Sequence, residues 1–342
     1  MDNSKIFNKF GFYFNMNKTL FLFLALTIFL TSCNQKKTND FNDNEAKSNN
    51  VSVIIDDELW NGEIGDSIRN KFASPVIGLQ EEEPIFTLNQ YPVKLLEGFM
   101  TNSRNILVVK KEAKSKYYIK QNEYTTPQIA VHISGRNVQE ILDTLEVNAP
   151  QIINKFKASE VAIFQKRIIR NSLEKDKIKS RFNILINIPS KYSIVLQGKN
   201  FLWLKKEILT GNLSLLIYQA PLNRLNDTTN IVYDIVKVRD SIGRKYIHGT
   251  KSRTIMKTES AFAPYLTKME LFGRPVYETK GNWELSNDFM SGPFVNYAIV
   301  DKKNNRVLFL EGFCYAPSKD KRDLMLELES VIKSTQFLKK QE

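Results

Sequence analysis

The chain has 342 residues, of which 42% are hydrophobic and 25% are charged. This ordinary globular composition excludes a wholly disordered chain, a collagen-like chain and a multi-pass membrane protein. Two cysteines are too few for a disulfide framework or a four-cysteine metal site, and two histidines leave little material for histidine chemistry. The formal net charge of +12 favours contact with anionic polymers or lipid head groups, but it defines neither a fold nor an activity.

The first residues have the pattern of a secretory leader. An uncharged, strongly apolar run at 19–30 follows Lys18 directly and ends in small residues. A helix of that length spans roughly 18 Å, which is too short for a hydrocarbon core of about 30 Å. The run closes with Leu-Thr-Ser-Cys at 30–33, which resembles a bacterial lipobox. That resemblance implies cleavage before Cys33 and acylation, with chains such as palmitate, of its thiol and new amino terminus. The alternatives are an ordinary signal peptide with a chance cysteine, or an uncleaved membrane span.

This leader predicts where the protein lies in the cell. We expect a lipoprotein signal peptide at 1–32 and a flexible tether at 33–50, because residues 34–50 are nearly all Asn, Lys, Asp and Ser. Cys33 would then anchor the chain in the cell envelope. No acidic cluster follows the cysteine directly, which favours the outer membrane on the side facing the periplasm. A nucleic-acid partner is not expected outside the cytoplasm. Translation starts at either Met1 or Met16.

The remainder predicts an α+β fold of mostly antiparallel sheets with packed helices, in two α/β sub-domains at 51–180 and 181–342. Helices are predicted where apolar residues recur every three to four positions, and strands where β-branched or alternating runs occur. In chain order, strands are expected at 51–55, 85–88, 105–110, 128–134, 182–188, 193–196, 201–205, 212–218, 276–280, 294–301 and 307–313. Helices are expected from about 59 to 72, at 137–146, 150–177, 228–245 and 320–337.

The most basic stretch of the chain is residues 155–181, in and after the predicted helix at 150–177. This stretch contains nine lysines and arginines but only three acidic residues. It is either a solvated basic helix or a face for anionic lipid or lipopolysaccharide. The lone Cys314 lies in an apolar strand pattern and is expected to be a small buried hydrophobic residue rather than a nucleophile.

Several segments together resemble an uncharacterised family of Bacteroidetes-type lipoproteins known only as a domain of unknown function. The segments are 56–69, 78–86, 103–106, 201–204, 217–221, 278–284, 288–294 and 315–317. The resemblance extends over essentially all of 51–338. It implies a location and an architecture, but no mechanism, since no activity is established for the family.

Two sets of residues are candidates for chemistry. The acidic runs Asp56, Asp57, Glu58 and Glu81, Glu82, Glu83 would provide general acid–base catalysis if two of their carboxylates converged within about 5–10 Å. Alternatively, the first run caps a helix and the second lies in a solvated loop. The second set predicts a ligand groove, because aromatic clusters with few polar groups suit small-molecule or glycan contact as well as a core. Its members are Trp60, Glu83, Trp283, Glu284 and Phe294.

No pattern assigns a catalytic, cofactor-binding or metal-binding residue. The sequence therefore favours a lipid-anchored envelope protein acting as a non-catalytic binding or structural module. Its expected partners are the membrane, through Cys33, and another envelope protein or an anionic envelope polymer. The alternatives are a carboxylate-dependent envelope hydrolase and a module that binds anionic lipid or lipopolysaccharide.

Overall fold

The computed structural model describes residues 47–96, 101–225 and 229–338. The predicted leader, Cys33 and nearly all of the predicted tether therefore lie outside the described residues. The described residues all belong to one compact unit. No helix in these ranges is long and apolar enough to cross a membrane.

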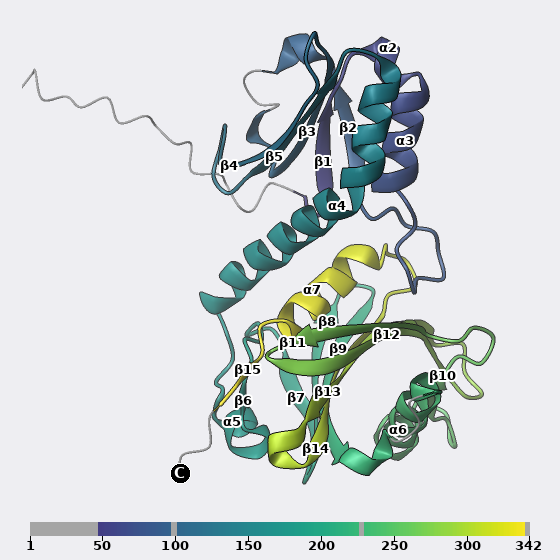
Figure 1. Cartoon of the computed structure of the whole chain (residues 1–342). Helices are drawn as coiled ribbons and strands as arrows, with labels where there is room; N and C mark the ends of the chain where they lie inside the picture. The colour runs from purple at the N-terminus through teal and green to yellow at the C-terminus, as the bar shows by residue number, and fades with distance from the viewer. Residues whose placement is uncertain (1–46, 97–100, 226–228, 339–342) are drawn as a thin grey trace, which may run out of the picture. The chain divides into compact units, whose positions relative to one another are not determined.

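The N-terminal part of the chain builds a five-stranded sheet in the order β2-β1-β3-β5-β4 (Figure 1). Its strands are β1 (Asn50–Ile54), β2 (Thr87–Tyr91), β3 (Asn105–Lys111), β4 (Lys116–Gln121) and β5 (Ile129–Gly135). The first four in this order pair in parallel, and β4 adds to β5 antiparallel. Parallel strands are usually buried on both faces, which explains why β1, β3 and β5 are rich in buried apolar residues.

Three helices accompany this sheet: α2 (Asp57–Trp60), α3 (Glu63–Phe72) and α4 (Val138–Ile169). Helix α3 buries Ile64, Ile68 and Phe72, as their spacing predicts. Helix α4 is a single helix through Pro150, where the sequence predicts two. An interior proline costs roughly 3 kcal/mol. Buried residues on both sides of it, such as Leu145 and Phe156, outweigh that cost by packing on the sheet.

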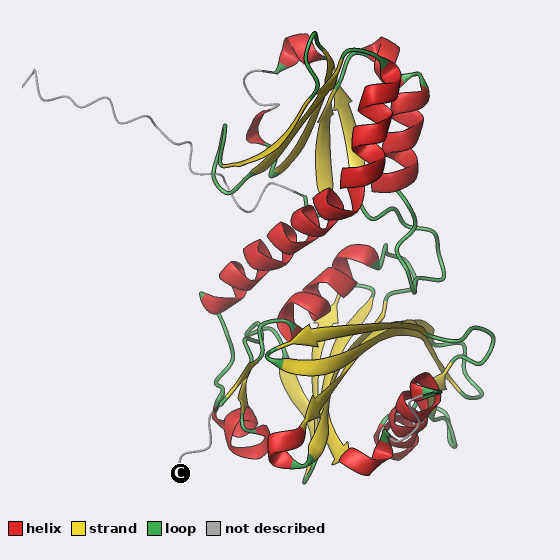
Figure 2. Ribbon diagram, viewed as in Figure 1, coloured by secondary structure: helices red, strands yellow, loops and turns green. Residues whose placement is uncertain are grey.

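The C-terminal part builds an eight-stranded antiparallel sheet in the order β10-β12-β13-β14-β9-β8-β7, with β11 paired to β12. Figure 2 shows the strands of this sheet in yellow, with red helices beside them. Its strands are β7 (Ser193–Gly198), β8 (Phe201–Ile208), β9 (Gly211–Pro221), β10 (Met256–Thr258), β11 (Tyr265–Leu271), β12 (Arg274–Leu285), β13 (Ser291–Asp301) and β14 (Arg306–Tyr315). The short β6 (Ile184–Leu185) and β15 (Gln336–Phe337) pair separately.

Helices cover both faces of this sheet, because successive side chains of a strand point to opposite faces. Helix α6 (Ile231–Tyr246) packs on one face, in a core that includes Phe294 and Phe309. Helices α7 (Arg322–Ile332) and α5 (Asp176–Phe182) pack on the other, in a core that includes Cys314. The buried Cys314 is free, and burial raises the pKa of its thiol to about 12.

The predicted fold class is confirmed: the chain is α+β, with large and mostly antiparallel sheets and packed helices. Ile178 and Phe182 of α5 pack in the core of the second sheet. The predicted division between residues 180 and 181 falls inside that helix.

Candidate functional site

Helices α4 and α7 pack beside each other (Figure 1). A cavity of about 480 Å³ lies at this contact. Its lining comes from these two helices, from strands β11 to β13 and from the loop that follows α3. The cavity is open to solvent, since Lys157, Ala158 and Ala162 on α4 and Ile77 in the loop after α3 are exposed lining residues. This volume is in the range of small-molecule sites, which are mostly apolar with a few placed polar groups.

The two helices present regularly spaced side chains to the cavity. The lining residues are Asn154, Lys157, Ala158, Val161, Ala162 and Gln165 on α4, and Arg322, Met325, Leu326, Glu329 and Lys333 on α7. Residues three and four positions apart share one face of a helix. The short side chains of Ala158 and Ala162 leave space opposite Met325 and Leu326, so the two helices contact each other without filling the volume between them.

A close approach of backbones builds another wall. Gly78, in the loop after α3, has φ +89°, a conformation that side-chain-bearing residues rarely adopt. A Cβ at this position would come within 2.9 Å of the Lys280 Cβ on β12. Glycine therefore lets this loop lie against the sheet and bring Ile77 and Leu79 to the cavity.

A chain of charged side chains forms the polar part of the lining. Tyr297 donates a hydrogen bond of 2.5 Å to Glu278 Oε1, and Lys280 Nζ lies 3.4 Å from the same oxygen. Lys280 Nζ is also 3.3 Å from Glu329 Oε2, and Lys333 Nζ is 2.5 Å from Glu329 Oε1. Strand β12 and helix α7 are thus joined through these groups.

This arrangement shifts the pKa values of the group. Burial alone would raise the pKa of Glu329, but Lys280 and Lys333 lower it to about 2. Burial would lower the pKa of Lys280, but the carboxylates of Glu329 and Glu278 raise it. The pKa of Lys157 is lowered, because its ammonium group is partly desolvated and lies near the positive charge of Lys280. The surroundings therefore favour the charged forms of Glu329 and Lys280, whereas they disfavour the charged form of Lys157.

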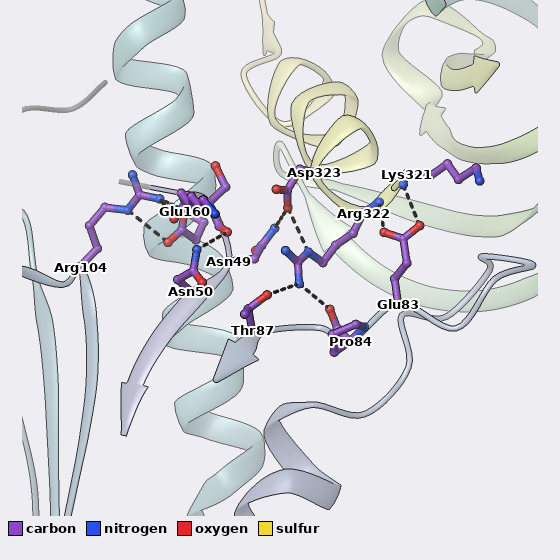
Figure 3. Close-up of polar contacts among 12 residues, drawn as sticks. Asn49, Asn50, Glu83, Pro84, Thr87, Arg104, Glu160, Lys321, Arg322 and Asp323 are labelled. Carbon is purple, nitrogen blue, oxygen red and sulfur yellow. Dashed lines mark hydrogen bonds and ion pairs between the residues drawn. The ribbon is translucent and has the colours of Figure 1, made fainter. Parts of the chain in front are cut away.

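Glu83 fixes the first turn of α7 at the edge of the cavity (Figure 3). It accepts hydrogen bonds from the backbone N–H groups of Lys321 and Arg322, at 2.7 and 2.8 Å. Unpaired N–H groups at a helix N-terminus attract such a carboxylate. Arg322 in turn donates to the Pro84 carbonyl and to Thr87 Oγ1.

A buried ion pair holds α4 to the first sheet close by (Figure 3). Arg104 Nη2 lies 2.9 Å from Glu160 Oε2, and both side chains are only 2% exposed. Asn105 donates to Glu160 Oε1, and Arg104 donates to the carbonyl of Lys47. Asn49, which lines the cavity, donates a hydrogen bond of 2.8 Å to Asp323 Oδ1 on α7. The first described residues are therefore fixed against both α4 and α7.

A buried polar network lies behind the Phe294 wall. The Arg239 guanidinium of α6 is 3.8 Å from the centre of the Phe294 ring. Arg239 Nε is 3.0 Å from Glu311 Oε1, and both side chains are at most 1% exposed. Tyr218 and Asn296 each donate to Glu311 Oε2, at 3.0 and 2.9 Å.

The five residues of the predicted groove do not meet at one site. Phe294 lines the cavity, and Glu83 caps the helix beside it. Trp60 lies on α2 with Arg69 over its ring. Trp283 is buried in the α6 core, where its indole N–H donates to the Cys314 carbonyl, and Glu284 pairs with Lys257. Trp283 and Phe294 therefore pack in the core on one face of the second sheet, whereas Phe289 between them is 97% exposed.

The two acidic runs are also not brought together. Asp56 and Asp57 follow the C-terminal end of β1 and accept hydrogen bonds from Val93 N and Gln90. Glu81 and Glu83 lie beyond the far end of α3 and contact the start of α7. Because α3 has 10 residues and runs back along the sheet, roughly 15 Å separates the two loops. Such a separation does not match paired carboxylates in glycosidic chemistry.

The residues that do converge carry weak sequence signals. Lys157 belongs to the basic stretch at 155–181, and Glu278 and Lys280 belong to one of the segments quoted for the family resemblance. Glu329 and Lys333 have no local motif, because α7 meets β12 only in the folded chain. Within the described ranges, no group of three or more His, Cys, Asp or Glu could hold a metal ion.

Two family models match the chain, one on each part. The Domain of unknown function (DUF8532) matches residues 45–169, and the Domain of unknown function (DUF4837) matches residues 171–334. Both are domains of unknown function. The predicted resemblance to a family known only in this way is confirmed, while the lipoprotein character and the bacterial group stay predictions. The two matches meet at the end of α4.

No curated protein matches the chain. Among solved structures, human StAR-related lipid transfer protein 5 is similar at 10% identity and a TM-score of 0.23, covering 51% of this chain and 98% of that chain. A likeness at this level carries no argument about function.

Proposed function

We propose that this chain is a lipid-anchored protein of the cell envelope and acts as a non-catalytic binding module, with the α4–α7 cavity as its binding site. The anchor would be Cys33, at an outer membrane facing the periplasm. The lipobox-like pattern at 30–33 supports the location. Another envelope protein or an anionic envelope polymer remains an expected partner of the surface, whereas the cavity suits a small molecule.

The cavity itself is the observation that carries the proposal. Packed elements normally interdigitate to the density of organic crystals, with few voids larger than a water molecule between them. Here a volume of about 480 Å³ combines apolar walls with a row of ion-paired side chains from two separate elements. Apolar walls with a few fixed polar groups are typical of ligand sites.

The anchor and the binding site are tested separately on the full chain expressed in its membrane. Labelling with an alkyne analogue of palmitate should mark the wild-type protein and not the Cys33→Ser variant. Failure to label the wild type contradicts the proposed anchor.

The binding site is tested by extracting small molecules that purify with the full chain and identifying them by mass spectrometry. Ala162→Trp places a large side chain in the cavity. Val147→Trp places the same side chain on α4 at a position that is 77% exposed and outside the lining. We expect the wild type and Val147→Trp to retain a common small molecule that Ala162→Trp loses. Equal retention by all three proteins, or retention by none, contradicts the proposed site.

A further inference from the structure

The charges around the cavity do not balance. The lining contains three lysines, Lys157, Lys280 and Lys333, but only two glutamates, Glu278 and Glu329. Lys280 and Lys333 bind the glutamates directly. Arg322, at the edge, is paired with Asp323 at 3.0 Å. One positive charge is therefore left without a matching carboxylate.

Lys157 carries that charge. No carboxylate among the described residues lies within ion-pair distance of its ammonium group, and the residue lines the open side of the cavity from α4. The lowered pKa of Lys157 agrees with this placement, because partial desolvation and the nearby Lys280 disfavour its charged form more than the carboxylates of Glu329 and Glu278 favour it. An anion bound beside Lys157 would offset both effects.

Apart from Asn49, Asn154 and Gln165, the rest of the lining is mostly apolar. Val161 on α4, Met269 and Leu271 on β11, and Met325 and Leu326 on α7 all face the cavity. Methionine side chains adapt to flexible apolar ligands. At about 30 Å³ for a group of the size of a water molecule, about 480 Å³ accommodates roughly sixteen such groups. This volume suits one acyl chain rather than the two chains of a phospholipid.

From these observations we infer that the cavity binds a single-chain amphiphile with one anionic head group, which lies against Lys157 at the opening while the chain runs along the apolar walls. This inference rests on the proposed function and specifies its ligand. It narrows the predicted contact with anionic lipid from the whole basic stretch at 155–181 to one lysine at the mouth of a cavity. The head group is a carboxylate or a phosphate, since both pair with an ammonium group.

The test uses the full chain in nanodiscs of neutral phosphatidylcholine and two photoreactive probes. One probe is a fatty acid that carries a diazirine, and the other is the alcohol with the same chain. Cross-linked peptides are mapped by mass spectrometry, and the acid-to-alcohol ratio of cross-linking is measured at α4 and α7. Partition of each probe into the membrane is the same for every protein variant, so it cancels when ratios are compared between variants.

Lys157→Met removes the charge and keeps an unbranched apolar side chain. Lys155→Met makes the same change two positions earlier on α4, at an exposed residue outside the lining. Charged hydrogen bonds contribute enough that we expect the acid-to-alcohol ratio to fall about tenfold or more in Lys157→Met. The ratio should stay at the wild-type value in Lys155→Met.

The possible outcomes separate this inference from the proposed function. If both probes label the cavity, Ala162→Trp blocks both, and Lys157→Met leaves the ratio unchanged, the binding site stands and the anionic ligand is refuted. If neither probe labels the cavity in the wild type, both proposals fail. Where the acid probe labels the cavity of the wild type, unlabelled alkyl phosphate, fatty acid and alcohol are added as competitors, which tells the two anionic head groups apart. Stronger displacement by either anion than by the alcohol supports the inference, and equal displacement by the alcohol contradicts it.

Discussion

The buried pair of Arg239 and Glu311 offers a direct test of how the second sheet holds α6. The side chains of both residues are at most 1% exposed, and Glu311 Oε1 is 3.0 Å from Arg239 Nε. Arg239 Nη1 also donates a hydrogen bond of 2.9 Å to Thr258 Oγ1. We consider three variants of the full chain: Arg239→Met, Glu311→Gln, and the two changes together.

The expected magnitudes follow from burial. Removing one partner of a buried ion pair leaves an uncompensated charge in the interior, which costs about 3–5 kcal/mol. Arg239→Met should therefore lower the free energy of unfolding by that amount, and Glu311→Gln by somewhat less, because Arg239 Nη1 also lies 3.7 Å from Asp240 Oδ1. The double change leaves no buried charge. The amide introduced by Glu311→Gln would keep an oxygen that accepts from Tyr218 and Asn296, so the double variant should lie within about 1–2 kcal/mol of the wild type.

Urea unfolding in a neutral detergent measures these differences. Two of the three tryptophans, Trp203 and Trp283, pack in the same core as α6, so tryptophan fluorescence reports mainly on this region. The coupling energy is the difference between the double variant and the sum of the two single variants. A double variant that loses as much free energy of unfolding as the two single variants combined would show that the charges do not stabilise each other, and the reasoning from burial would be refuted.

Two further predictions concern α7. Although burial raises the pKa of Glu329, Lys280 and Lys333 lower it from 4.5 to about 2, so its ionised form stabilises the fold above pH 4.5 and this contribution is lost as the pH falls towards about 2. This loss is at most about 3 kcal/mol. The difference in free energy of unfolding between the wild type and Glu329→Gln should therefore shrink between about pH 5 and about pH 3. A difference that stays constant over this range contradicts the prediction. A Cβ on Gly312 would meet the Leu328 Cβ at 2.7 Å, so Gly312→Ala should lower the free energy of unfolding by about 1–3 kcal/mol. Gly198→Ala, where the nearest contact is 3.5 Å, is the matched control, and equal effects of the two changes would contradict the prediction.

Local periodicity was sufficient to predict most of the elements. In α3 the apolar residues every four positions face the core, and in α7 Leu328, Val331 and Ile332 do the same. Each such element has an apolar face that is complete within its own sequence. The α+β class follows from the order of these elements along the chain.

The cavity could not be predicted in this way, because its lining is assembled from distant segments. Glu83 caps a helix that begins more than two hundred residues later, and nothing near it in the sequence indicates that role. Trp283 shows the converse error. A tryptophan in a glycine-rich and aromatic stretch suggests ligand contact, but the alternation of β12 turns its side chain into the α6 core.

The α4–α7 contact itself argues for a ligand rather than for an accident of packing. A purely structural contact between two helices gains most from large apolar residues, because each buried methylene contributes about 0.8 kcal/mol. Here α4 presents Ala158 and Ala162 where larger residues would fill the space, and it places Lys157 near a position that already holds Lys280. Both features cost stability in the empty protein. The proposed anionic amphiphile would remove both costs at once, since its chain would cover the apolar walls and its head group would balance the charge of Lys157.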